Sequence, residues 1–392
     1  MIWIVSATAF IVVVIVVVIQ LNNRPSGGRE HLMFPPTSGS LKFYYKGYPM
    51  FQDLFQDIKD AQKEVNIQFF IVKQDFISQQ FFSLLKETAK RGVVVRLLMD
   101  RLGCFRITKS TRKELEQAGV HVVFSDRPQF PHLLYQINRR NHRKIAVIDG
   151  KVGYTGGFNL GKEYIGKNPQ LASWRDYHLR LTGQVVNDLQ KIFQHDWEEA
   201  REPIFPIYGS FPEEPRNVQV LATDGAKLEE HFISLIDGAQ GEILLGTPYF
   251  IPSDRLFNAL IRAVKRGVAI KVLIPMNANH MLVKEAGIPF FTELKEAGGD
   301  VRLFDQGFYH SKIFIIDQNI CDIGSANFDM RSMFLNKEIN LLISDPGFVQ
   351  NVRNHFLSDF KQGIPVSRQW MNQLDLGTRL RIPIARMLRP LL

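Results

Sequence analysis

The body of this chain contains the same pattern twice, and this duplication constrains its fold more than any other feature. Short segments of the first half recur in the second half in the same order, a little under 180 residues later. The matching pairs are residues 60–65 and 237–243, 90–98 and 265–273, and 114–119 and 293–298. Because chance does not preserve both the order and the spacing of three such pairs, the sequence predicts an internal duplication.

Each copy alternates short apolar runs with helical patterns. An apolar run (65–71 in the first copy, 243–250 in the second) precedes a helical pattern that ends in Lys-Arg-Gly, and a second apolar run follows. A glycine after two cations is typical of a helix C-terminus. This rhythm predicts α/β halves with largely buried sheets. Residues 202–216 carry four prolines and separate the halves, which we place at 42–205 and 213–392.

The N-terminus predicts a membrane anchor. Residues 1–19 are apolar apart from one serine and one threonine, and the first charge is Arg24. Nineteen helical residues rise about 28 Å, which matches the hydrocarbon core of a bilayer. The basic residues follow this segment, unlike those of a signal peptide, and place the rest of the chain in the cytoplasm. We expect one transmembrane helix at 1–20 in the cell membrane, then a linker at 21–41 rich in Pro, Gly and Ser; a cleaved signal or a buried strand are the alternatives.

Charge and cysteine content narrow the function only slightly. The chain has 392 residues, enough for two domains with sizeable cores. Its net charge of +9 suits an anionic partner, a condition that nucleic acid, anionic lipid and phosphorylated substrates all satisfy. Its two cysteines, Cys104 and Cys321, lie in no metal-ligand spacing, which favours two unrelated core thiols over a disulfide or a cysteine zinc site.

Each half carries one motif of the form HxKxxxxD. The motif residues are His142, Lys144 and Asp149 in the first half, and His310, Lys312 and Asp317 in the second. After each aspartate, six residues intervene before a glycine-containing segment that ends in asparagine, at 156–159 and 324–327. One such motif is weak, but two with the same spacing inside a repeat are a strong signal.

Strand geometry gives these residues different positions. The four residues between each lysine and aspartate are strand-like, and residues i and i+2 of a strand share a face. Each histidine therefore projects to the same side as its lysine. The two aspartates have the opposite parity, so we expect them to hold local structure or to bond behind the site. Asn159 and Asn327 follow glycines, which allows them to return to its rim.

The paired motifs resemble the HKD motif of the phospholipase D superfamily, over essentially the whole chain from about residue 40. Other segments resemble those of bacterial cardiolipin synthases, namely 141–144, 155–160, 174–178, 248–252 and the end of the chain at 389–392. The resemblance implies two tandem phospholipase-D-like halves. The commoner synthases of this kind carry two N-terminal spans, whereas this chain has room for one.

The resemblance also implies a mechanism without a metal or a cofactor. It makes all six motif residues candidates for catalysis. One histidine attacks the phosphodiester as neutral imidazole, and the other, protonated, delivers a proton to the departing glycerol oxygen. Because the N-terminal motif usually supplies the nucleophile in this superfamily, we assign attack to His142 and proton donation to His310. The expected phosphate donors besides the lysines are Asn159, Ser325 and Asn327.

A carboxylate is expected to orient each histidine. Glu338 follows His310 by 28 residues, where the resemblance places such an acid. Asp176 is the candidate for the half that contains His142. We therefore expect each acid to serve the histidine of its own half.

Three features near the motifs have two interpretations each. His178 lies at the edge of the site or only on a strand. Arg139, Arg140 and Arg143 form a solvated face or contact an anionic substrate. The basic and apolar tail at 378–388 contacts an anionic bilayer surface or docks on the body.

The predicted function is that of a cardiolipin synthase. A phosphatidyl group passes from one phosphatidylglycerol to a histidine and then to a second phosphatidylglycerol, giving cardiolipin and glycerol. A hydrolytic phospholipase D is the alternative, since the motifs do not reveal which acceptor reaches the shared phosphohistidine intermediate. A nuclease is a third hypothesis, but small nucleases of this superfamily carry one motif and dimerise, so no nucleic acid is expected. The expected partners are phosphatidylglycerol and the bilayer.

Overall fold

The computed structural model describes residues 31–389 apart from 127, 129–131, 169–172, 201–216, 278–279 and 281. The anchor predicted at residues 1–20 lies outside the described residues. Among the helices of the described part, none is both long and apolar enough to cross a membrane. The single membrane span therefore stays a prediction.

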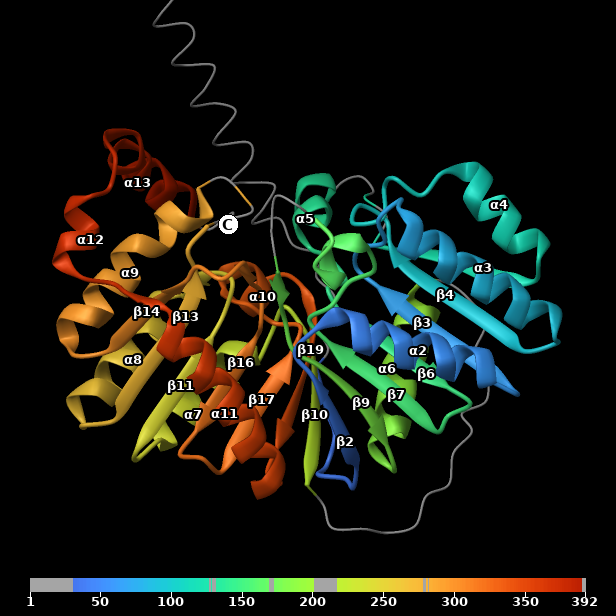
Figure 1. Ribbon diagram of the computed structural model, residues 1–392, viewed down its shortest axis with the longest axis horizontal. Helices are drawn as coiled ribbons and strands as arrows, with labels where there is room; N and C mark the ends of the chain where they lie inside the picture. The colour runs from blue at the N-terminus through green and yellow to red at the C-terminus, as the bar shows by residue number, and fades with distance from the viewer. Residues whose placement is uncertain are drawn as a thin grey trace, which may run out of the picture.

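The first half is built on a seven-stranded sheet with the order β2-β9-β7-β6-β3-β4-β5 (Figure 1). In this order the strands are Ser40–Tyr44, His178–Thr182, Val152–Gly156, Ile145–Ile148, Glu64–Phe69, Val94–Asp100 and Val120–Ser125. The three strands β3, β4 and β5 are parallel, and the other neighbours are antiparallel.

The second half repeats this sheet and adds a strand at each edge, in the order β1-β10-β19-β17-β16-β11-β13-β14-β20. These strands are His31–Met33, Val218–Asp224, Lys337–Ile343, Ile320–Gly324, Ile313–Ile316, Glu242–Gly246, Ala269–Pro275, Asp300–Phe304 and Ile364–Pro365. From β10 to β14 the order and the directions match the first sheet strand for strand. The predicted duplication is therefore confirmed in three dimensions.

Helices cover both faces of the two sheets. In the first half they are α2 (Gly47–Asp60), α3 (Phe76–Lys90), α4 (Lys109–Gln117), α5 (Leu133–Asn138) and α6 (Val185–Glu199). In the second half they are α7 (Leu228–Gly238), α8 (Asp254–Lys265), α9 (Val283–Ala297), α10 (Met330–Phe334), α11 (Pro346–Gln362), α12 (Arg368–Asn372) and α13 (Leu376–Leu388). The predicted Lys-Arg-Gly ends are confirmed, because Gly92 and Gly267 follow α3 and α8 with φ of +87° and +91°.

A shared core joins the two sheets. The apolar faces of α6 and α11 pack between them, so that one cluster contains Ile145 and Val147 of the first sheet together with Ile313 and Ile315 of the second. Two further cores lie outside, under α2 and α3 on one side and under α7, α8 and α9 on the other. Full burial of each large apolar side chain contributes about 1.5–3 kcal/mol. The halves therefore form one body rather than two separate domains.

The linker predicted at 21–41 is wrong for its described part. Strand β1 pairs with β10 of the second half, and β2 begins at Ser40 and pairs with β9 of the first half. Between them, the amide of Thr37 donates to the carbonyl of Val218 at 2.7 Å. The Pro-Gly-Ser composition indicated a loop, but two short edge strands need few apolar residues because one partner strand supplies their hydrogen bonds.

Candidate active site

Both motif histidines lie where the two halves meet, and the backbone of the opposite half holds each of them. The amide of His142 donates to the carbonyl of Lys337 at 2.9 Å, and the amide of His310 donates to that of Arg175 at 2.7 Å. Short parallel pairings carry these contacts, since Asn141 bridges to Lys337 and β15 (Phe308–Tyr309) pairs with β8 (Trp174–Arg175). The segment before each histidine therefore lies beside a segment of the opposite half. That segment directly precedes Glu338 in one case and Asp176 in the other.

The acids consequently serve the histidines of the opposite halves. Nδ1 of His142 lies 2.9 Å from a carboxylate oxygen of Glu338, and Nδ1 of His310 lies 2.6 Å from Asp176. Both predicted acids therefore contact a motif histidine, but the expected pairing within each half is wrong. Sequence spacing did not reveal this exchange, because it arises from the pairing of segments between the halves.

The two lysines share the side of their histidines, as the strand parity predicts. Nζ of Lys144 donates to the carbonyl of His142 at 2.6 Å, and Nζ of Lys312 lies 3.7 Å from Asp176. Burial lowers the pKa of Lys144 to about 7 and that of Lys312 to about 8, although nearby Glu338 and Asp176 oppose the shift. Near neutral pH Lys312 is therefore mostly charged and Lys144 about half charged, and an anionic substrate would raise the pKa of both.

Burial also determines the protonation state of the two histidines in the free enzyme. It lowers the pKa of His142 to about 4 and that of His310 to about 3, against the raising effect of the paired acids. Burial alone raises the pKa of Glu338 and of Asp176, but the neighbouring histidines and lysines overcome it and lower both. At neutral pH the site therefore holds two neutral imidazoles, each with a carboxylate at Nδ1. Nε2 is then the nitrogen available for nucleophilic attack.

The motif aspartates hold turns and do not contact the histidines. Asp149 accepts from the amides of residues 62, 63 and 64, and Asp317 accepts from those of residues 240, 241 and 242, at 2.7–3.0 Å. Both have positive φ, +53° and +49°, a conformation that aspartate tolerates in a turn. Their inclusion among the catalytic candidates is therefore corrected, while the structural role predicted from parity is confirmed. The same contacts explain why segments 60–65 and 237–243 match.

The three expected phosphate donors differ in their contacts. Ser325 donates to Glu338 at 2.5 Å and accepts from the amide of Ile339, so it holds the acid rather than facing a substrate. Asn159 accepts from the amide of Ile71 at 3.0 Å. Oδ1 of Asn327 is buried without a hydrogen-bond partner among the described residues, and as an oxygen it can only accept a hydrogen bond from a donor group of a ligand.

In the first half, Gly157 occupies the position that corresponds to Ser325. The two halves differ here because their acids differ in length. A Cβ atom at Gly157 would come within 1.9 Å of the carboxylate of Asp176. The shorter aspartate therefore needs glycine beside it, whereas the longer glutamate accepts a serine hydroxyl. The sequence carried this signal as Gly-Gly with Asp in one half and Gly-Ser with Glu in the other.

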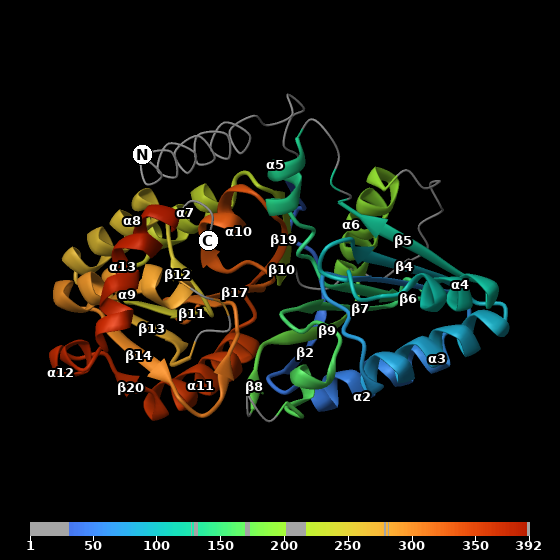
Figure 2. The same cartoon turned by 90° about the horizontal axis from the view of Figure 1, so that it is seen from above.

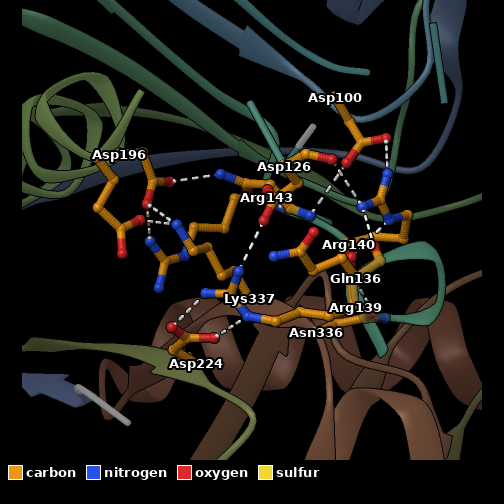
Figure 3. Close-up of polar contacts among 12 residues, drawn as sticks. Asp100, Asp126, Gln136, Arg139, Arg140, Arg143, Asp196, Asp224, Asn336 and Lys337 are labelled. Carbon is orange, nitrogen blue, oxygen red and sulfur yellow. Dashed lines mark hydrogen bonds and ion pairs between the residues drawn. The ribbon is translucent and has the colours of Figure 1, made fainter. Parts of the chain in front are cut away.

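The arginine cluster before and within the first motif is an internal clamp, so neither of its two interpretations is correct. Arg143 pairs with Asp196 at 2.6 Å (Figure 3). It also donates to the carbonyls of Glu338 and Thr223. Its neighbours form similar contacts: Arg140 with Asp100, and Arg139 with Asp126 and Asp224. Sequence reasoning missed these acids because they come from β4, α6, β10 and the loop after β5, which lie far apart in the chain.

Aromatic rings complete the walls of the site. The ring of Phe70 packs edge-on against that of His142, with 4.8 Å between the ring centroids. The ring centroids of Trp174 and His310 are also 4.8 Å apart. His178, in contrast, is a buried strand residue whose Nδ1 accepts from the amide of Phe158. Burial lowers the pKa of His178 to about 3. It contributes structure beside the site rather than chemistry.

One group in the described part of the chain could offer three metal ligands, namely His195, Asp196 and Glu199. Lys337 forms ion pairs with both acids of this group. Asp196 is also paired with Arg143. The cations already neutralise these carboxylates, so the group serves the clamp.

Comparison with known proteins agrees with the paired motifs. A family model described as "Cardiolipin synthase, PLD-like domain" matches residues 54–197 and again residues 232–360. The minor cardiolipin synthase ClsB of Bacillus subtilis is 40% identical over 332 residues, which cover 84% of this chain and 83% of that protein. The chain belongs to the cardiolipin synthase family of phospholipase-D-like proteins.

Other relatives span nearly the whole chain. The major cardiolipin synthase ClsA of Bacillus subtilis is 33% identical over 398 residues, which cover 95% of this chain and 81% of the relative. Among solved structures, phosphatidylserine synthase of Haemophilus influenzae superposes with a TM-score of 0.68 at 15% identity, over 96% of this chain and 99% of that one. The structural likeness shows the shared fold, and the sequence relatives show the family.

Proposed function

We propose that this chain is a cardiolipin synthase that transfers a phosphatidyl group between two phosphatidylglycerol molecules. The carrying observation is the crossed arrangement, in which two histidine–carboxylate pairs and two buried lysines meet between the halves. Two histidines in one site suit a reaction with two consecutive displacements at phosphorus. The named relatives supply the choice of lipid.

In the first step, Nε2 of neutral His142 attacks phosphorus. The bond from phosphorus to the glycerol oxygen breaks, and protonated His310 gives its proton to that oxygen. Glu338 stabilises the positive charge that develops on His142. Because the resting pKa of His310 is low, it must gain its proton when the anionic phosphodiester enters and raises that pKa.

In the second step, His310 is neutral and acts as a base. It removes a proton from a hydroxyl group of the second phosphatidylglycerol, whose oxygen attacks phosphorus while the bond to His142 breaks. Lys144 and Lys312 balance the charge on the phosphoryl oxygens in both steps. Water in place of the second lipid gives phosphatidic acid, which is the hydrolytic alternative.

The proposal includes the membrane setting expected from the sequence. We place the catalytic body at the cytoplasmic surface of the cell membrane, attached by residues 1–20. The supporting observations are the apolar N-terminal segment and the basic residues that follow it. Protease accessibility of the body in sealed inside-out vesicles, but not in intact spheroplasts, tests this orientation.

The decisive experiment incubates the purified chain with phosphatidylglycerol in detergent and identifies the products by mass. Cardiolipin with an equal amount of glycerol is the expected result, and phosphatidic acid with glycerol would instead establish the hydrolase. His142→Ala should abolish both products. His121→Ala is the matched control, because His121 is an exposed histidine on β5 of the same half.

A further inference from the structure

The last helix, α13, presents an apolar ridge to the outside of the molecule. The ridge consists of Leu376, Leu380, Ile384 and Met387, whose exposed fractions lie between 49% and 71%. At 3.6 residues per turn, these four positions fall within an arc of about 80°. Exposed apolar side chains gathered on one helix face mark an interaction surface, whereas scattered ones do not.

The opposite side of α13 is docked on the body. Ala385 is fully buried in a small cluster with Ile251 and Ala286, and Ile382 packs against the core of the second half. The side chain of Asp375 caps the helix by accepting from the amide of Thr378 at 2.9 Å. The tail thus docks on the body, as one of its two interpretations predicts, yet docking uses only one face.

Two ion pairs fix the rotation of the helix about its axis. Arg381 pairs with Glu285 of α9 at 2.8 Å, and Arg389 pairs with Asp254 of α8 at 2.9 Å. Rotating the ridge inward would break both pairs and expose Ala385. These contacts with the body therefore fix the orientation in which the ridge faces outward.

Cations line one flank of the ridge. Arg379 and Arg386 lie side by side at one edge of it by helical spacing, and both are exposed. The guanidinium of Arg379 donates to the carbonyls of Leu374 and Asn372, so its charge is not balanced by these contacts. An apolar ridge beside cations is the pattern of a helix that lies in the interface of an anionic bilayer.

The buried face of α13 packs on a strand that is linked to the site region. Ile251, which packs with α13, belongs to β12 (Phe250–Ile251), and β12 pairs with β18 (Phe328–Asp329), directly after Asn327. In the first half, α5 precedes His142 and carries the exposed Ile137. Figures 1 and 2 show α13 and α5 on the same side of the molecule.

We propose that α13 docks the enzyme on the surface of an anionic bilayer, with its apolar ridge among the lipid headgroups. This inference rests on the proposed function, since an enzyme whose substrate is an anionic lipid must meet the bilayer that holds it. The cations beside the ridge favour anionic lipid over a second copy of this basic chain, in which like charges would meet.

Site-specific fluorescence tests the contact in the full-length protein. Cys104 and Cys321 are buried, so Leu380→Cys provides one accessible thiol for an environment-sensitive dye. Val94→Cys is the matched control, because Val94 is an exposed apolar residue at the start of β4, the end opposite Asp100. The N-terminal segment attaches both variants to membranes equally, and protein without an added cysteine reports background labelling.

In vesicles of phosphatidylglycerol, the dye at position 380 should shift its emission to the blue and be quenched by lipids with a nitroxide on the acyl chain. The dye at position 94 should show neither change. A blue shift without quenching would mean that protein covers the ridge, either residues 1–30 or a second copy, and would overturn the proposal. An unchanged spectrum at position 380 would overturn it as well.

Two further variants separate docking from catalysis. Arg386→Gln should reduce quenching at position 380 when phosphatidylglycerol is limiting, since one cation near an anionic surface changes partitioning about fivefold. The double variant Leu380→Glu, Ile384→Glu should turn over phosphatidylglycerol in vesicles more slowly but dispersed short-chain phosphatidylglycerol at the normal rate. Equal losses on both substrates would refute docking. If the chain turned over neither lipid, the proposed function would fail, while quenching at position 380 would still report bilayer contact.

Discussion

Each acid supports the histidine of the opposite half, and this pairing can be tested by replacing each acid with its amide. A substrate whose leaving group needs no proton should restore the activity of one of the two variants only. If Glu338 supports the nucleophile His142, Glu338→Gln should slow the attack on any substrate. If Asp176 supports the proton donor His310, Asp176→Asn should slow only reactions whose leaving group needs a proton. Pairing within the halves, as expected from the sequence, predicts the reverse.

The expected size of both effects follows from the geometry. Each carboxylate lies 2.6–2.9 Å from Nδ1 of an imidazole that becomes positively charged during the reaction. At an effective dielectric constant of about 20, two unit charges at this distance attract by about 6 kcal/mol. Since about 1.4 kcal/mol corresponds to a factor of ten in rate, each amide variant should lose up to about 10⁴-fold in kcat. Loss of orientation by the neutral amide acts in the same direction.

The assay compares phosphatidylglycerol with a p-nitrophenyl phosphodiester, whose leaving group departs without a proton. In single-turnover measurements, Asp176→Asn should regain most of its rate on the p-nitrophenyl substrate, and Glu338→Gln should remain slow. Asp322→Asn is the matched control, because Asp322 is a buried acid near His231 and outside the site. Rescue of Glu338→Gln alone would refute our assignment of the nucleophile, and equal behaviour of the two variants would refute separate roles for the pairs.

Four further outcomes follow from the structure. His142→Ala and His310→Ala should each remove nearly all transferase activity on phosphatidylglycerol, and the double variant should be little worse, because parts of one catalytic unit are not additive. The pKa of Lys144 is lowered to about 7 and that of Lys312 to about 8, so kcat/KM should fall as the pH rises through this range, and Lys144→Arg should move that fall to higher pH. Asp149→Asn should lower the free energy of unfolding in urea by about 1–3 kcal/mol, since it weakens acceptance from three backbone amides. Activity on a soluble short-chain substrate should survive EDTA, because the donors assigned to the phosphate are lysines and amides; loss that added metal restores would contradict this chemistry.

Several features followed from the sequence because they depend on short-range geometry. The period of two along a strand placed each histidine with its lysine and excluded the aspartates from their face. The Lys-Arg-Gly segments ended helices because glycine accepts positive φ. The order of the matching segments revealed the duplication, and the two sheets repeat one strand order. These inferences needed no knowledge of how the halves pack.

The tertiary structure decided everything that depends on contacts between the halves. Glu338 and Asp176 were recognised as acids of the site, but only the pairing of segments across the halves assigned each to its histidine. The arginine cluster became a clamp because its acids converge from two strands, a helix and a loop that are distant in the chain. Residues 31–33 and 40–41 became parts of edge strands because the two sheets offered them hydrogen-bond partners. A sequence specifies local conformation and the chemistry of its side chains, whereas the identity of each side chain's partner is decided when the two sheets bury their shared core.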